Sequence, residues 1–299
     1  MFKSCRTAAI VILIALFAIP ALSQDVKPFT DDEKKAIWAA AETASINGPK
    51  DVPLANQAKL HLPENFIFVP KPQAAELMRM WGNSTGDAFY GLVFPKSQTE
   101  TWVISIDHIS EGFVKDDDAK TWNADELLQS LKDGTAAQND DRAQLGIPAL
   151  DVVGWVQKPE YDAGQHRLVW SLKAVQRGAP ADKPSTINYN TYALGRDGYF
   201  QVNLMTDDKT IATDKASALK IVSAVDYNQG KRYADFNAAT DHIAEYGLAA
   251  LVAGVAAKKL GLLAVAGLFI AKFAKIIIAA LAIGGGGLFK WFRRKSDDA

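Results

Sequence analysis

The chain has 299 residues, of which 48% are hydrophobic and 22% charged, the balance of a protein with a packed core. The net charge of −1 combines an acidic stretch with a basic one: residues 24–245 hold 23 Lys and Arg against 32 Asp and Glu, and residues 246–299 hold 8 against 2. Because the part with a globular composition is the acidic one, a nucleic-acid-binding domain is excluded. A single cysteine, Cys5, excludes an internal disulfide.

The first 23 residues have the pattern of a secretory signal peptide. Lys3 and Arg6 precede an apolar run, Ala8 to Ile19, and small residues follow around Ser23, where we predict cleavage. A retained anchor helix is the alternative, although the run is shorter than the ~20 residues that span a bilayer. Cleavage would also remove Cys5, so the mature protein would have no thiol for catalysis or metal binding.

Helix starts recur along the following 200 residues. Thr30 with Glu33, Asn123 with Glu126, and Thr135 with Gln138 each have the spacing of a capping box. Pro72 suits the first turn of a helix that ends at Gly82, and Thr213 suits the start of another. Gly134 separates two predicted helices, residues 124–133 and a short one that ends near Gly146.

Segments rich in β-branched and aromatic residues lie between these helices. They predict strands over residues 88–94, 101–109, 151–157, 166–175, 187–194 and 199–205. Short turn sequences at Asp162–Gly164 and Gly195–Gly198 join neighbouring strands, which indicates antiparallel hairpins. We therefore expect an α+β domain over residues 27–240, with an antiparallel sheet and helices on one face.

Three adjacent carboxylates, Asp116, Asp117 and Asp118, follow one predicted strand. A calcium loop alternates its acidic ligands and needs a glycine at the bend, but Lys120 occupies the next ligand position. The pattern instead favours acidic side chains at the start of a helix, where free N–H groups and the helix dipole favour negative charge. No two of the four histidines have metal-ligand spacing, and His108, on a predicted strand, is interpreted as structural rather than as a general base.

From residue 243 to residue 292 the sequence is apolar and interrupted by lysines. A span over about residues 267–289 places Lys272 and Lys275 towards one end, and a basic tail, residues 293–299, follows it. By the positive-inside rule the C-terminus is then cytoplasmic. Two further patterns leave alternatives to a single span. Small residues are spaced three or four apart from Gly247 to Ala264, which allows close helix–helix packing as in a helical hairpin. Lys258, Lys272 and Lys275 fall on one side of a helix, which fits a helix that lies in the membrane interface.

Several motifs together resemble a bacterial family of membrane-anchored proteins catalogued as domain of unknown function 2167. The motifs are Gly112–Asp117, Val153-Gly154-Trp155 with Pro159, Tyr161 and Asp162, Leu168-Val169-Trp170, Asn188-Tyr189-Asn190 with Leu194-Gly195-Arg196, Gly230 with Arg232–Phe236, and Tyr246–Ala249. The resemblance covers about residues 45–290 and implies a signal peptide, an exported domain and a C-terminal membrane anchor. It assigns no reaction, so no catalytic residue is carried over. Inside these motifs, the candidate functional surface consists of Asp116, Asp117, Tyr161, Asp162 and Arg196.

Three functions fit these observations. The first is an envelope protein of the bacterial inner membrane whose periplasmic domain binds a partner or ligand; the second is a membrane-assembly subunit acting through its C-terminal helices. The third is an exported hydrolase that uses carboxylates such as Asp116 and Asp162, with His108 as a base. The expected partners are the lipid bilayer and an envelope protein; no cofactor, metal or nucleic acid is expected.

Overall fold

A computed structural model describes residues 29–81, 85–97, 99–144, 149–180 and 185–253 of the chain. The predicted signal peptide, residues 1–23, and the predicted membrane span, residues 267–289, lie outside the described residues, as does the basic tail. Among the described residues, no helix combines the length and the apolar character that crossing a bilayer requires.

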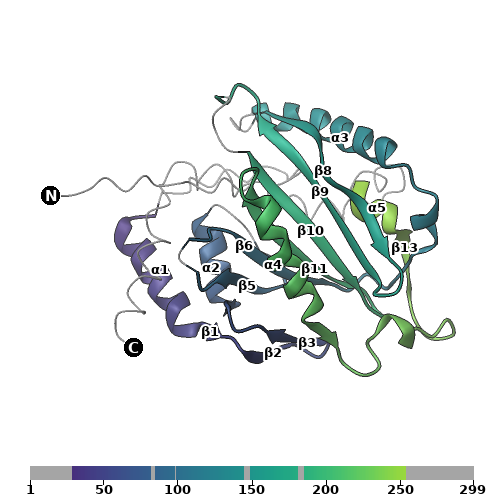
Figure 1. The fold of residues 1–299 in the computed structure, drawn as a ribbon, viewed down its shortest axis with the longest axis horizontal. Helices are drawn as coiled ribbons and strands as arrows, with labels where there is room; N and C mark the ends of the chain where they lie inside the picture. The colour runs from purple at the N-terminus through teal and green to yellow at the C-terminus, as the bar shows by residue number, and fades with distance from the viewer. Residues whose placement is uncertain (1–28, 82–84, 98, 145–148, 181–184, 254–299) are drawn as a thin grey trace.

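The domain is built on one antiparallel sheet, as the sequence predicts (Figure 1). In sheet order its eight strands are β1 (Ile46–Asn47), β4 (Phe66–Pro70), β5 (Phe89–Pro95), β6 (Val103–Ile109), β11 (Tyr199–Asp207), β10 (Thr186–Leu194), β9 (Arg167–Gln176) and β8 (Leu150–Asp162). All six predicted strands are confirmed within this sheet. The described residues also form a three-stranded sheet of β12 (Val225–Tyr227), β3 (Ala58–Leu62) and β2 (Lys50–Leu54), and a parallel pair of β13 (Ile243–Gly247) and β7 (Phe113–Lys115).

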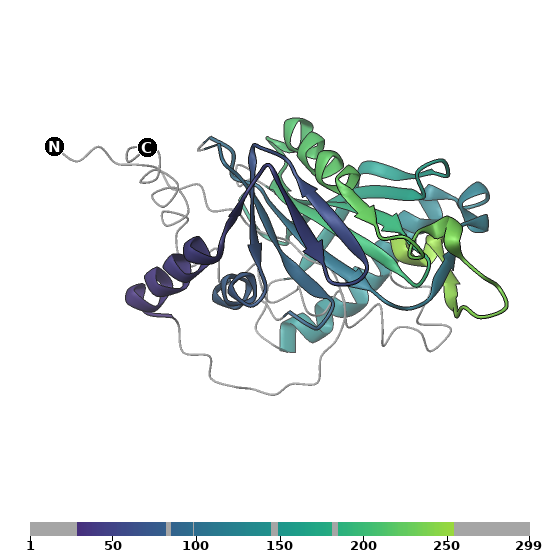
Figure 2. The same ribbon diagram turned by 90° about the horizontal axis from the view of Figure 1, so that it is seen from below.

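Helices cover both faces of the large sheet, so the expectation of helices on one face is wrong. Helix α4 (Ile211–Ser223) and the three-stranded sheet cover one face, and α1 (Asp31–Ala44) and α2 (Gln73–Met80) cover the other, as Figure 2 shows from below. Alternation along the central strands supplies both layers: Ile104 and Ile106 face α4, whereas Val103 faces α2. Because both faces of the sheet are covered, every residue of β6 is buried, including the polar Ser105, Asp107 and His108.

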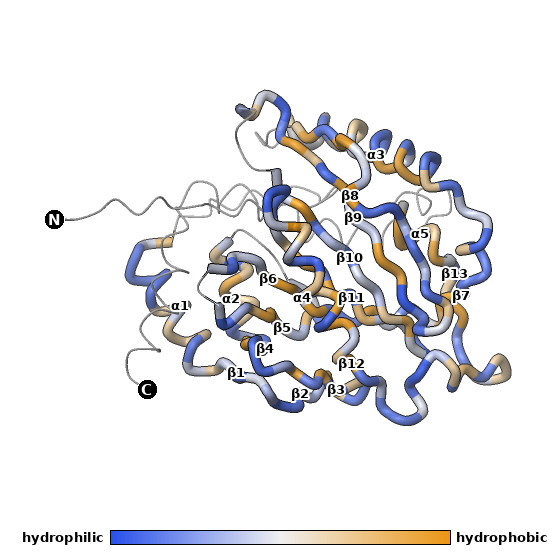
Figure 3. The backbone as a smooth tube through the Cα atoms, in the orientation of Figure 1, coloured by the Kyte–Doolittle hydropathy of each residue, from blue (hydrophilic) through white to orange (hydrophobic). Residues whose placement is uncertain are grey.

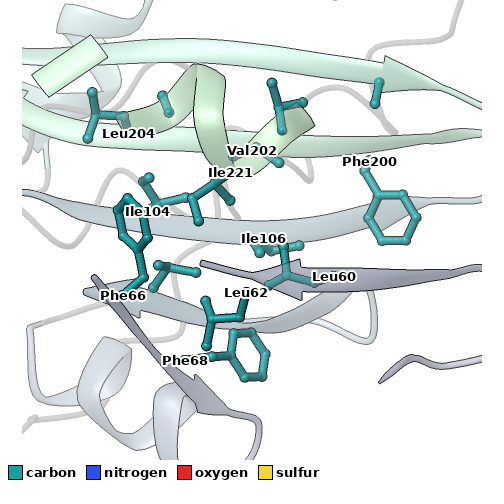
Figure 4. Close-up of a cluster of buried hydrophobic side chains, with 14 of the residues drawn as sticks. Leu60, Leu62, Phe66, Phe68, Ile104, Ile106, Phe200, Val202, Leu204 and Ile221 are labelled. Atoms are coloured by element: carbon teal, nitrogen blue, oxygen red, sulfur yellow. The ribbon is translucent and has the colours of Figure 1, made fainter. Parts of the chain in front are cut away.

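The layer under α4 is the largest of the three apolar clusters that the described residues form. Apolar side chains from the two sheets and the helix meet there (Figure 4). Leu60, Ile106, Val202 and Ile221 are each 0% exposed. Burying a side chain of this size fully contributes about 1.5–3 kcal/mol, so this layer carries much of the stability of the domain.

Helix α3 (Ala124–Gln144) differs from its prediction. Asn123 caps it as expected, since its side-chain oxygen accepts from the backbone N–H of Asp125 at 2.9 Å. The helix does not stop at Gly134 but continues through Thr135, whose hydroxyl donates to the carbonyl of Leu131 at 2.7 Å. A single glycine costs a helix only about 1 kcal/mol, which tertiary packing outweighs here. Hydropathy alternates along α3 in Figure 3, and its apolar side packs on β8.

Helix α3 also protects the edge of the sheet. Asn139 both donates to and accepts from the backbone of Leu150 on the edge strand β8, each at 2.9 Å. The indole of Trp155 donates to the carbonyl of Ala124 at 3.1 Å. A covered edge strand presents fewer free backbone groups for pairing with another chain.

Candidate functional site

The 228–247 segment lies next to two of the predicted functional residues, since Arg196 bonds Asp241 within it and Asp116 lies beside Tyr233. This segment follows β12, contains the 3₁₀ helix η2 (Tyr233–Asp235) and β13, and leads into α5 (Leu248–Ala253). It pairs with the turn after β10, where Gly195 bridges Arg232, and with β7, where the N–H of Phe113 donates to the carbonyl of His242 at 2.8 Å. We call β7, η1 (Asp117–Lys120) and the 228–247 segment the junction, because they connect the sheet to the helix that begins the apolar sequence.

Asp116 and Tyr161 form the one direct bond between predicted candidates. The phenol of Tyr161 donates to Oδ2 of Asp116 at 2.7 Å, and Nδ1 of His166 lies 3.3 Å from the same phenol. Burial, followed by the bond to Asp116, raises the pKa of Tyr161 well above its usual value. The phenol therefore stays protonated and fixes the β8–β9 hairpin against the start of η1.

An aromatic stack lies beside this bond. Tyr233 stacks on His166 at 4.2 Å between ring centroids and on Phe113 at 4.3 Å, and Phe113 stacks on Phe236 at 3.8 Å. The Tyr233 hydroxyl donates to the carbonyl of Val114 at 2.9 Å. Stacked rings are worth about 0.5–1.5 kcal/mol each beyond the area they bury, so η2 is held firmly on β7.

Asp118 has a definite partner that the sequence did not reveal. Its two carboxylate oxygens accept from the backbone N–H groups of Leu248, at 3.1 Å, and Ala249, at 2.9 Å. These are free N–H groups in the first turn of α5. An acidic side chain does bond the start of a helix, as the sequence predicts, but the helix is α5 and not α3, which follows the aspartates in the chain. Gly247 allows the approach, since a Cβ there would lie 2.5 Å from Oδ2 of Asp118.

The other candidates have separate structural environments. Asp162 accepts from the N–H groups of Gly164 and Gln165 and so forms the β8–β9 turn. Arg196 makes a bidentate ion pair with Asp241, in which Nε donates to Oδ2 at 2.7 Å and Nη2 donates to Oδ1 at 2.8 Å. This pair lowers the pKa of the Asp241 carboxyl. Asp117 is exposed, beside Asp116 on η1. The carboxylates thus do not converge on one point, and the geometry gives the predicted hydrolase no support.

His108 belongs to a second polar group that the sequence did not predict. It lies on β6 at 5% exposure, with its ring 4.7 Å from that of Phe200, and burial lowers its pKa to about 4. Asp197, in the turn after β10, acts on it electrostatically and pairs with Lys231 at 2.8 Å. The turn sequence Gly195–Gly198 was visible in the sequence, but its proximity to His108 depends on pairing between β6 and β11.

The described acidic and histidine side chains of this region do not gather around one point. Within the described parts of the chain, no group of three or more His, Cys, Asp and Glu side chains could hold a metal ion. The adjacent aspartates diverge: Asp116 bonds Tyr161, and Asp118 bonds α5.

Comparison with known proteins identifies a family but no activity. The family described as "Protein of unknown function (DUF2167)" matches residues 46–282, in agreement with the resemblance found in the motifs. No curated protein matches the chain.

The solved structures to which the chain is similar are distant from it. The chain is similar to cyanobacterial PsbP (CyanoP) from Synechocystis sp. PCC 6803, at 10% identity and a TM-score of 0.35, over 62% of this chain and 91% of that one. It is also similar to the Ran-binding protein Mog1p of Saccharomyces cerevisiae, at 13% identity and a TM-score of 0.29, over 59% of this chain and 93% of that one. TM-scores this low support no conclusion about this chain.

Proposed function

Because the chain belongs to the family of proteins of unknown function DUF2167, whose description assigns no activity, we propose that it is a membrane-tethered envelope protein. In this proposal the folded domain lies on the periplasmic side of the bacterial inner membrane and binds a protein partner. The apolar sequence after α5 holds the domain at the bilayer, and the C-terminus is cytoplasmic.

The observation that carries the proposal is the docking of α5 on the domain. Asp118 caps its first turn, and Leu248 and Val252 are 0% and 1% exposed in the same apolar cluster as Val114. From Leu248 to residue 283 the sequence contains only Ala, Gly, Val, Leu, Ile, Phe and Lys. The apolar sequence therefore continues from a fixed helix with no polar linker between them, and the junction end of the domain would lie nearest the lipid.

Exposed apolar residues on β8 support a partner-binding role. Val153 and Val156 are 54% and 40% exposed, and Val153 lies in a family motif with Gly154, where an added Cβ would meet open space. Contiguous exposed apolar surface is where partner proteins bind, so this stretch of β8 is the surface assigned to the partner in this proposal.

Membrane attachment is tested by alkaline extraction of membranes that contain the full chain. We expect the chain to remain in the membrane fraction, and a variant with Ile277→Lys and Leu281→Lys to be released, because each lysine at the centre of a span costs about 2.5–3.5 kcal/mol. Ile243→Lys, at an exposed position in β13, is the matched control and should stay bound. Release of the unmodified chain, or a periplasmic reporter that is inactive when fused within the domain, would contradict the proposal.

Partner binding is tested by a photo-crosslinking residue at position 153 in intact cells. We expect a discrete cross-linked protein from position 153 and none from position 219, where Leu219 on α4 is 37% exposed. Equal cross-linking at the two positions would count against a specific surface. Cross-links found only from positions in the apolar tail would favour the alternative of an assembly subunit.

A further inference from the structure

Gln57, His108 and Asp197 form a polar cluster next to the junction, in which the first two are buried and the Asp197 side chain is 39% exposed. Gln57, in the turn between β2 and β3, is 8% exposed, and His108 is 5% exposed. The Gln57 amide donates to Oδ2 of Asp197 at 3.4 Å, and Asp197 and His108 each shift the pKa of the other. Three elements that are distant in sequence therefore bring these polar side chains together.

Each of the three residues has one buried polar atom with no hydrogen-bond partner among the described residues. These atoms are Oε1 of Gln57, Nε2 of His108 and Oδ1 of Asp197. A buried polar atom without a partner costs about 1–3 kcal/mol, and folded proteins rarely contain three together. Reversing the Gln57 amide gives no relief, because its oxygen would then face the Asp197 carboxylate.

The charges in the cluster determine what can occupy it. The Lys231 ammonium lies 2.8 Å from Oδ2 of Asp197, so the carboxylate is already neutralised and a metal cation would be repelled. Two of the atoms without a partner, the Gln57 and Asp197 oxygens, can only accept hydrogen bonds. A neutral molecule with two donors and one acceptor meets all three requirements.

We propose that these three atoms bind one ordered water molecule, which donates to Gln57 Oε1 and Asp197 Oδ1 and accepts from His108 Nε2–H. Buried waters make about three hydrogen bonds to groups that otherwise have no partner, as this one does. The water joins the β2–β3 turn, β6 and the β10–β11 turn, and through the Asp197–Lys231 pair it reaches the 228–247 segment.

The proposal fixes the tautomer of His108. Because both protons of the water go to obligate acceptors, Nε2 carries the imidazole proton and Nδ1 is an acceptor. Nδ1 lies 3.2 Å from the Ser110 hydroxyl, which then donates to it. A neutral ring at neutral pH agrees with the pKa of about 4 that burial gives His108.

Nitrogen-15 NMR of the histidine rings in the intact, detergent-solubilised chain tests the tautomer. We expect the Nε2–H form for His108, both in the unmodified protein and in Ser110→Ala, which removes the hydroxyl but not the water. The Nδ1–H form, or a mixture of tautomers in Ser110→Ala, would overturn the proposal. A crystal structure that resolves ordered waters should show one within about 2.7–3.2 Å of all three atoms, and a dry site would also overturn it.

Discussion

The centre of the large sheet and the junction are held together by different kinds of interaction. In the centre, Ile104, Ile106, Val202 and Leu204 are all 0% exposed and pack between two layers. At the junction, position depends on directional contacts: the Asp118 cap of α5, the Arg196–Asp241 pair, and the Tyr233 stack. Apolar burial stabilises a fold without fixing one exact position, whereas hydrogen bonds and ion pairs fix position and add modest net stability.

This difference predicts two kinds of mutational effect. Substitutions in the centre should lower the free energy of unfolding of the whole domain. Substitutions at the junction should change local opening, and with it the position from which the apolar sequence leaves the domain, at smaller global cost. Four experiments test the comparison, from the largest expected effect to the smallest.

Ile106→Ala should have the largest effect. Its side chain is fully buried on β6, and such a truncation costs about 2–5 kcal/mol through lost burial and the cavity that remains. The matched control is Leu219→Ala on the exposed side of α4, which should stay within about 0.5 kcal/mol of the unmodified protein. Urea unfolding followed by tryptophan fluorescence measures the free energy of unfolding of both variants. Equal losses would contradict the claim that the centre of the sheet is the main source of stability.

The buried His108 should make stability fall in mild acid. Its folded pKa of about 4 lies below the usual value of 6.5, so below pH 6.5 the unfolded chain binds a proton that the folded chain does not. The free energy of unfolding then falls by about 1.4 kcal/mol per pH unit, or about 2 kcal/mol by pH 5, and levels off near the folded pKa. His108→Phe keeps a ring against Phe200 and should lose this dependence, whereas His242→Gln, at an exposed position, should keep it. Urea unfolding curves of the unmodified protein and the two variants at several pH values measure this dependence, and an unchanged dependence in His108→Phe would contradict the prediction.

Much of the central sheet could be predicted from the sequence, and little of the junction could. Segments rich in β-branched and aromatic residues predicted β5, β6 and β8–β11, because residues with strand propensity are also the ones buried there. β2 was missed because it contains Pro53, and β4 because its short apolar run has no period. The Asp118 contact joins residues 130 positions apart, and the Arg196–Asp241 contact joins residues 45 apart, so neither leaves a local pattern. Asp116 and Tyr161 lie in two of the motifs, but nothing in the sequence predicted the bond between them, and His166 and Gln57 had no signal beyond their residue type.

Arg196→Lys separates geometry from charge at the junction. Lysine keeps the positive charge but cannot make the two parallel bonds to Asp241 or the third to the carbonyl of Gly230. The pair is only partly exposed, at 30% and 13% for the two side chains, so we expect the 228–247 segment to become less stable. Arg177→Lys changes a similar pair with Asp151 that is 60% and 45% exposed, and should cost less stability because solvent screens that pair. Hydrogen exchange at the amide of Asn237, which donates to Asp241, reports the local loss, and equal exchange in the two variants would contradict it.

Asp118→Asn should have the smallest effect on the global stability of the domain, and its local effect should be confined to the start of α5. Asparagine keeps one acceptor oxygen, so one of the two bonds to the N–H groups of Leu248 and Ala249 is lost, at a cost of about 1 kcal/mol for a helix cap. Exchange of these two amides should then be about 5-fold faster, while the urea midpoint of the domain stays nearly unchanged. The neighbouring Asp117→Asn removes the same charge from an exposed side chain and should leave both amides as they are. If the two variants exchange alike, the cap does not fix α5, and the domain would meet the apolar sequence through a loose connection. The contrast between an apolar centre and a positionally fixed junction would then fail, and with it the main support for a domain held in one orientation at the membrane.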